Sequence, residues 1–305
     1  MPDAASAELD HDVVVVGGGP SGTGAAVFTA RYGLDTVVYD RGNAALARAA
    51  FVQNYPGFPG GIDPETLMAL FHDQLDAVGA TRIADLVDAV DRVDDGPGFH
   101  VATAEGEPVT ARYVVAAAWY DGSYLKPLED DGELFVTELH HDEEHELLDR
   151  SFPAPDGRTP IDGLYVAAPT EHRNAQAITA AGHGAHVART LLQDRREAEG
   201  LSGEVARVYD WLRPESEFNG DWAERERWEQ WFDNEMGDTD ASDEEIARLR
   251  ERYIDRAFAT ERSPAEIEEL RHEGHRRLAE HLDTTAVLDA VDDEAIEAYL
   301  DENGE

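Results

Sequence analysis

The run Asp12-Val-Val-Val-Val16 is followed at once by Gly17-Gly-Gly-Pro-Ser-Gly22, and this stretch decides the fold. A short run of β-branched residues predicts a buried strand, and the glycines predict a tight turn after it. The alanine-rich residues 21–32 predict a helix, and residues 35–39 (DTVVY) predict a second strand. A strand, a helix and another strand within about 30 residues form a βαβ unit, which requires a parallel sheet.

The glycines follow the pattern Gly17-x-Gly19-x-x-Gly22, and Asp40 ends the second predicted strand. In such a pattern the first glycine allows the tight turn, the second lets a diphosphate approach the backbone, and the third allows close helix–sheet packing. The helix N-terminus offers N–H donors to phosphates, and an acid placed like Asp40 accepts hydrogen bonds from a ribose diol. We therefore predict dinucleotide binding, the alternative being a purely structural glycine turn.

The composition excludes several classes of function. The chain of 305 residues has 66 acidic and 25 basic side chains, which gives a formal net charge of −41. This charge disfavours nucleic-acid binding, which needs clustered cations, and docking on an anionic membrane surface. Lys126 is the single lysine, and the acidic excess runs through the whole chain, so we interpret it as halophilic adaptation. The lack of cysteine excludes disulfides, thiolate metal sites and dithiol chemistry in this chain.

The sequence also carries an expectation about location. No apolar run reaches the roughly 18 residues of a transmembrane helix. Residues 1–11 are acidic and lack the parts of a signal peptide. We therefore expect a cytoplasmic protein that does not contact a membrane.

The rest of the chain divides into two regions. Up to residue 199 the pattern predicts a helix over 63–79 with Asp63 as N-cap, a β-meander over 81–117, a strand over 164–168 and a long helix over 176–199. Beyond residue 200 we expect about five helices and no strand, because helical periodicity and two capping boxes dominate there.

Three segments resemble the FAD-binding parts of thioredoxin reductases. They are GGGPSGTGAAVFTARYGL with VVYDRG (residues 17–42), NYPGFPGGIDPETLM (54–68) and DGLYVAAP…NAQAITAAGHGAHVA (162–188). They occur in the family's order, so the resemblance covers about residues 10–190. It implies FAD as cofactor and the following contacts: Gly17, Gly19, Pro20, Ser21 and Gly22 with the pyrophosphate, Asp40 with the ribose and Arg41 beside it, Val87 with the adenine, Asn54 near the flavin, and Gln176 and Ala177 as backbone donors to the isoalloxazine edge.

The chain departs from that family in ways that bear on activity. The family inserts an NADPH-binding domain with a CxxC motif between its two FAD segments, whereas residues 120–160 are too few for one and hold no second glycine fingerprint. The strand ends Ala117-Ala118-Trp119 and Ala168-Pro169 also differ from the family's, and the second one bears on how the flavin is held. Thioredoxin reduction by the family's dithiol is therefore not available to this chain alone.

These observations predict the fold class and two functions. We expect an α/β protein: a three-layer FAD/NAD(P)-binding Rossmann-type domain with a β-meander over residues 1–199, plus an acidic, all-helical region over 200–305. The first function is that of an FAD-dependent oxidoreductase whose substrate is unknown and whose electron donor is a separate protein or a small reductant. The alternative is a non-catalytic dinucleotide-binding regulatory or interaction protein; NAD(P) in place of FAD is a third option, with Asp40 favouring NAD. No catalytic residue can be named, and a homodimer stays open.

Two histidine clusters are weaker candidates. His140-His141-Asp142-Glu143-Glu144-His145 offers metal-ligand side chains, but adjacent residues point away from one another, so we favour a solvated acidic connector and predict no metal site. His272, His275 and His281 are expected on an exposed helix face.

Two further clusters bear on the flavin and on the helical region. His172 and Arg173 lie just before Gln176, and either a positive charge beside the flavin or a plain surface loop explains them. Trp119 and Tyr120 are expected either to cover the flavin face or to fill the space of the missing domain. The tryptophans at 211, 222, 228 and 231 predict core packing or docking of the helical region, with a partner surface as the alternative.

Overall fold

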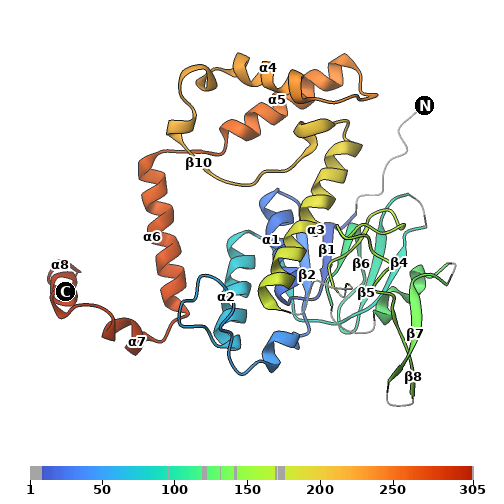
Figure 1. Cartoon of the computed structure of the whole chain (residues 1–305), viewed down its shortest axis with the longest axis horizontal. Helices are drawn as coiled ribbons and strands as arrows, with labels where there is room; N and C mark the ends of the chain where they lie inside the picture. Colours follow the sequence, from blue (N-terminus) through green and yellow to red (C-terminus); the bar gives the residue numbers. More distant parts are fainter. Residues whose placement is uncertain are drawn as a thin grey trace.

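The computed structural model describes residues 9–94, 96–118, 122–130, 132–140, 143–168, 170 and 176–303. Within them a mixed sheet is covered by helices, and a group of helices extends away from it at the C-terminal end (Figure 1). No helix of the described part has the length and apolar character needed to cross a bilayer.

The central sheet is parallel where the glycine fingerprint meets it. Its main strand order is β3-β2-β1-β6-β5-β4, and β9 pairs with the second half of β6. The pairs β1–β2, β1–β6, β2–β3 and β6–β9 are parallel, while β4–β5 and β5–β6 are antiparallel. The strands are β1 (His11–Val16), β2 (Thr36–Tyr39), β3 (Thr81–Ile83), β4 (Val87–Arg92), β5 (Phe99–Thr103), β6 (Val109–Ala116) and β9 (Leu164–Val166).

This topology confirms the α/β fold class and refines the expected meander. The first strand of the 81–117 stretch, β3, is parallel to β2 because the helix α2 (Pro64–Ala77) connects the two. The meander therefore begins at β4. Asp63 caps α2 as predicted, since its carboxylate accepts the Thr66 N–H at 2.8 Å.

Two hydrophobic layers sandwich the sheet. On one face the helices α1 (Pro20–Arg31) and α3 (Ala177–Ala198) pack on the valines of β1 and their neighbours. On the other face the meander and the 3-10 helix η2 (Ser123–Leu128) bury the alternate valines. Because β1 is covered on both faces, Val13 to Val16 are all buried, as a continuous β-branched run predicts.

The helices α1 and α3 approach each other closely because of two glycines. A Cβ on Gly24 of α1 would lie 2.3 Å from the Ala181 carbonyl oxygen of α3. A Cβ on Gly184 of α3 would lie 1.8 Å from the Ser21 carbonyl oxygen. These contacts fix the spacing of the two helix N-termini that face the candidate site.

Between β6 and β9 the described residues form η2 and a two-stranded hairpin. The strands β7 (Phe135–His140) and β8 (Glu143–Leu148) pair antiparallel, with His140 opposite Glu143. Most of their described side chains are exposed, and the hairpin projects from the body of the molecule (Figure 1). Residues 141 and 142 of the histidine cluster, as well as Trp119 and Tyr120, lie outside the described residues.

The region after residue 200 is helical, with one short exception. The two-residue strands β10 (Arg213–Pro214) and β11 (Glu261–Arg262) form a parallel pair that the sequence did not predict. The capping boxes Ser242–Glu245 and Ser263–Glu266 are both present. The α-helices are α4 (Arg225–Glu235), α5 (Asp243–Phe258), α6 (Pro264–Glu280), α7 (Thr284–Asp289) and α8 (Asp293–Asn303), and the short 3-10 helices are η3 (Gly203–Ala206), η4 (Glu215–Glu217) and η5 (Gly220–Ala223).

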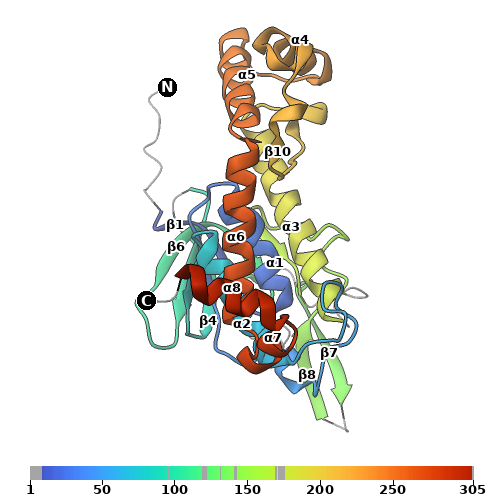
Figure 2. The same cartoon turned by 90° about the vertical axis from the view of Figure 1, so that its left-hand side faces the viewer.

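The aromatic residues of this region build a small core. Phe232 is fully buried between η3, α4 and α5, and Trp228 packs with Phe218 and Phe258. The predicted core role therefore holds for Trp228 and, in part, for Trp222 and Trp231, which pack against the same clusters. Trp211 instead is 62% exposed. Figure 2 shows α6 as a long rod leading from α5 back toward α2, followed by α7 and α8.

Candidate functional site

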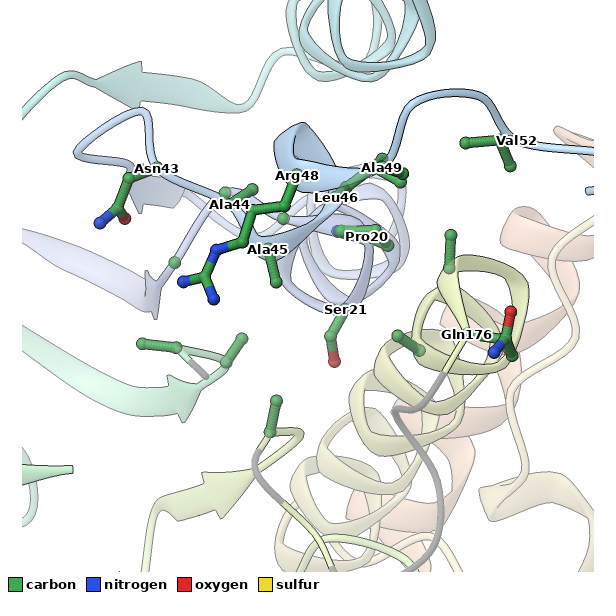
Figure 3. Close-up of a pocket in the computed structure, with 18 of the residues that line it drawn as sticks. Pro20, Ser21, Asn43, Ala44, Ala45, Leu46, Arg48, Ala49, Val52 and Gln176 are labelled. Atoms are coloured by element: carbon green, nitrogen blue, oxygen red, sulfur yellow. The ribbon is translucent and has the colours of Figure 1, made fainter. Parts of the chain in front are cut away.

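The candidate site is a cavity of about 630 Å³ at the carboxyl ends of β1, β2, β6 and β9. The N-termini of α1 and α3 both open on it, and the segment after β2 covers it from the other side (Figure 3). The carboxyl edge of a parallel sheet is where open α/β folds bind their ligands. The lining residues are Gly17 to Ser21, Asp40, Arg41, Asn43 to Leu46, Arg48, Ala49, Phe51 to Asn54, Ala117, Ala118, Ala168, Gln176, Ala177 and Ala180.

One end of the cavity is built by the glycine fingerprint. Gly17 has a φ of +108°, which L side chains rarely adopt, and it turns the chain from β1 into α1. A Cβ on Gly22 would lie 1.8 Å from the Gly17 carbonyl oxygen, so only glycine fits there. Gly19 is the N-cap of α1, and Pro20 is its first residue. The free N–H groups of this helix start therefore face the cavity, where they can bind phosphate oxygens.

Ser21 stands on the first turn of α1 and lines the same cavity (Figure 3). Its hydroxyl donates to the Ala167 carbonyl oxygen, just beyond β9, at 3.0 Å. Ser21 thus connects the glycine turn after β1 with the end of β9, about 146 residues later in the sequence.

Asp40 is held as a buried carboxylate at the end of β2. Its Oδ1 accepts the Gly42 N–H at 2.9 Å, and its Oδ2 lies 3.3 Å from His72 Nε2 and 3.8 Å from a guanidinium nitrogen of Arg82. The His72 ring at 3.3 Å lowers the pKa of Asp40, and this effect outweighs burial, which acts in the opposite direction. Asp40 is therefore ionised at neutral pH and suited to accept hydroxyl donors. A Cβ on Gly18 would lie 2.6 Å from Asp40 Oδ2, so the glycine turn and the carboxylate are in direct contact.

The other end of the cavity joins two segments that are far apart in the sequence. Asn54 Nδ2 donates to Gln176 Oε1 at 2.6 Å. Gln176 is the N-cap of α3, so the positive end of a 22-residue helix points at this part of the cavity. Small side chains from three elements complete the wall here, namely Ala117, Ala118, Ala168, Ala177 and Ala180.

The structure thus brings together ten of the eleven site residues predicted from the sequence. Gly22 contributes through packing rather than as a lining residue. Arg41 lines the cavity, and its Nε donates to Asn43 Oδ1 at 2.8 Å. Val87, in contrast, is 3% exposed and packs in the core between the sheet and the meander, so it does not line the cavity.

Several weaker candidates do not join this site or lie outside the described residues. Pro169, His172, Arg173 and Asn174 are not described. The described residues hold no group of three or more His, Asp or Glu arranged for a metal ion. His281 lies 3.4 Å from Asp73 of α2 and so helps to join α6 to the sheet domain.

The sequence reasoning missed Arg48, the arginine on the 3-10 helix η1 (Ala45–Arg48). The flanking alanines give no periodic signal, so the sequence did not place this side chain at the cavity. The one available signal was its position: Arg48 lies on the short segment between Asp40 and Asn54, and both of these residues were assigned to the site.

The fold and the cavity have the features of a nucleotide-binding protein of the Rossmann type. Comparison with known proteins then points to thioredoxin reductases. The thioredoxin reductase of Aquifex aeolicus (strain VF5) is 34% identical over 110 residues, which are 35% of this chain and 33% of that protein. The one of Bacillus subtilis (strain 168) is 32% identical over 115 residues, 37% of this chain and 35% of that protein.

The structural comparison agrees with the sequence comparison. A solved thioredoxin reductase from Gloeobacter violaceus superposes with a TM-score of 0.51 at 20% identity, over 67% of this chain and 98% of that one. No family model matches the chain. The resemblance predicted from the sequence is therefore confirmed, and it supports the FAD/NAD(P) oxidoreductase family. The matches span about a third of the length of these curated relatives.

Proposed function

We propose that the protein binds FAD in this cavity and serves in flavin-dependent redox chemistry. One observation carries the proposal: a single cavity reaches from the Gly17–Gly22 turn and Asp40 to the Asn54–Gln176 pair, and two helix N-termini open on it. A dinucleotide needs a diphosphate site, a ribose acceptor and room for a ring system in that order. Bound FAD would supply hydride or electron transfer, while the protein binds and orients it.

The donor set fits FAD at each part. The α1 N-terminus and the absence of a side chain at Gly19 suit a diphosphate. The ionised Asp40 suits a ribose diol. The α3 N-terminus suits the electron-rich edge of a flavin, because a helix start stabilises negative charge. The alanines of the wall leave space for a flat ring.

The proposal is tested with the full chain purified in molar salt. The expected result is a flavin absorption spectrum, either as purified or after addition of FAD and removal of the excess, that bleaches on reduction with dithionite. Gly19→Val should abolish retention of FAD, because its side chain blocks the phosphate approach. A wild-type protein that stays colourless after incubation with FAD contradicts the proposal, and titration with NAD then tests the remaining dinucleotide.

The source of electrons is part of the proposal. The relatives are named thioredoxin reductases, yet this chain has no cysteine, and its described residues between β6 and β9 form η2 and a hairpin. We infer that the electron donor is a separate protein or a diffusible reductant. The same observations favour a second candidate, a non-catalytic FAD-binding regulatory protein, and turnover of the reduced flavin by an added acceptor separates the two.

The high negative charge bears on the salt concentration in which the protein works. At molar salt the Debye length falls to about 3 Å, so the self-repulsion of a chain with net charge −41 is screened. We propose a halophilic, cytoplasmic protein with an FAD-binding domain over residues 1–199 and a helical region over 200–305. Homodimer formation is tested by sedimentation in the same salt.

A further inference from the structure

The candidate cavity has the opposite charge balance to the rest of the chain. Acidic residues outnumber basic ones by 66 to 25 over the whole sequence. Among the described residues that line the cavity, the charged ones are one acid, Asp40, and two arginines, Arg41 and Arg48. Since Asp40 already has His72 and Arg82 close to its carboxylate, Arg48 adds a positive charge to the described part of the lining. Such a lining favours an anionic ligand.

Arg48 differs from most arginines of the chain in its surroundings. Within the described part of the chain, at least fourteen arginines form an ion pair with an acidic side chain, such as Arg158 with Asp194 and Arg277 with Asp73. Among the residues that the structure describes, no carboxylate lies within 4.0 Å of the Arg48 guanidinium. In a chain so rich in acids, an arginine at a cavity wall without such a partner has its donors available for a ligand.

The local sequence explains how the side chain reaches the cavity. Residues 44–50 read Ala-Ala-Leu-Ala-Arg-Ala-Ala, so Arg48 is the only side chain with hydrogen-bond donors in this segment. Leu46 anchors the segment to the apolar cluster of α2. The neighbouring alanines have short side chains, so they leave space for the Arg48 side chain to extend along η1.

The segment is packed against the phosphate end of the site. A Cβ on Gly19 would lie 3.6 Å from Ala44 Cβ, so the start of η1 adjoins the glycine turn. Figure 3 shows the guanidinium of Arg48 on the side of Asn43 and Ala45, well away from Gln176 at the other end. The positive charge therefore belongs to the diphosphate end and not to the end of the Asn54–Gln176 pair.

We propose that Arg48 binds the diphosphate of the bound dinucleotide and sets the preference for a diphosphate-linked cofactor over flavins that lack this group. The planar guanidinium offers paired N–H donors, which match two phosphate oxygens, and the helix start of α1 binds the opposite side of the same group. The assignment rests on the proposed function, since it concerns the same cavity.

The experiment compares FAD binding by the full-length wild type, Arg48→Ala, Arg48→Lys and a control, Arg92→Ala. Arg92 is an exposed arginine on β4 that does not line the cavity. Loss of a charge-assisted, two-pronged hydrogen bond should weaken FAD binding about ten- to a hundred-fold in Arg48→Ala. Arg48→Lys keeps the charge but lacks the paired N–H donors, so its FAD affinity should lie between those of the wild type and Arg48→Ala. The control should bind like the wild type, and all four proteins should have the same far-UV circular dichroism.

A competition measurement identifies the group that Arg48 contacts. Inorganic pyrophosphate should compete with FAD in the wild type and in Arg92→Ala, and should compete much less in Arg48→Ala. FAD affinity within about two-fold of the wild type in Arg48→Ala overturns the assignment, as does equal competition in the two proteins. A wild type that binds no FAD overturns the proposed function together with this assignment, whereas the other two outcomes leave FAD binding itself intact.

Discussion

The helix α3 of the sheet domain and the C-terminal helices α6 to α8 form for different physical reasons. In α3 nine residues are buried, and Gly184 lets the helix touch the backbone of α1. In α6, α7 and α8 no residue is buried, and the apolar side chains Leu270, Leu278, Leu282, Leu288, Val291, Tyr299 and Leu300 are all exposed. Packing specifies α3, whereas local signals support α6 and α7: a capping box and ion pairs between Glu273 and the neighbouring arginines in α6, and the N-cap Asp283 in α7.

The difference shows that the close packing of α1 against α3 determines the geometry of the site. The spacing of the two helix N-termini depends on contacts that tolerate no added atom. The helices α4 and α5 form an intermediate case with a small core of their own. We therefore expect changes in α7 and α8 to leave the cavity unaffected, whereas α6 contacts α2 through Arg277 and Asp73.

The largest expected effect is at the crossing of α1 and α3. Gly184→Ala places a Cβ 1.8 Å from the Ser21 carbonyl oxygen, so the helices must separate, and we expect a loss of about 5 kcal/mol or more in the free energy of unfolding. Gly182→Ala, two residues earlier on the same helix, meets no atom within 4 Å and should stabilise the protein by about 0.5–1 kcal/mol. Urea unfolding of both variants checks the pair, and equal effects would show that α1 and α3 are not in close contact.

Removal of the core between α4 and α5 should have a large but local effect. Phe232 is fully buried, and Phe232→Ala should lower the free energy of unfolding of α4 and α5 by about 3–5 kcal/mol. FAD binding should stay within error of the wild type, because no residue of the cavity contacts this core. Limited proteolysis after residue 200, together with an FAD titration, makes the measurement. A parallel loss of FAD binding would mean that the two regions fold as one unit.

A moderate, pH-dependent effect is expected at Asp40. Its pKa is lowered in the folded protein, so the ionised form stabilises the fold above the unfolded pKa of about 3.9, and this stabilisation is lost as the pH falls through the lower folded value. Asp40→Asn should lower the free energy of unfolding by about 1–3 kcal/mol at neutral pH and should leave it almost unchanged in strong acid. Thermal melts of the wild type and the variant from neutral to acidic pH should therefore converge; a constant difference would exclude an ionised Asp40 as the cause.

The smallest effect should come from removing α7 and α8. Deletion of residues 283–305 takes away helices without a buried residue and keeps the contact between His281 and Asp73. We expect the free energy of unfolding to change by less than about 0.5 kcal/mol. A clearly lower melting temperature in calorimetry would contradict this and would show that the exposed apolar residues are covered in solution.

The sequence predicted the phosphate end of the site because its glycines and Asp40 lie within one βαβ unit. It placed Asn54 and Gln176 at the flavin end only through the resemblance, and it did not predict their hydrogen bond, because these residues are 122 positions apart. It missed the hairpin β7–β8, since the apolar residues in FVTELH and EEHELL do not alternate regularly with polar ones. It also missed Arg48, which tertiary packing of η1 on the glycine turn brings to the cavity. For Val87 the resemblance suggested a cofactor contact, whereas the alternation of β4 buries this side chain in the core.

Hydrogen exchange with and without FAD reports on the cavity and on the C-terminal helices in one experiment. We expect FAD to slow exchange in three segments, residues 17–24, 40–54 and 176–182, and to leave residues 264–303 unchanged. Protection confined to one of the three segments, or protection that appears in α6 to α8 instead, would contradict a cofactor bound between the two helix N-termini.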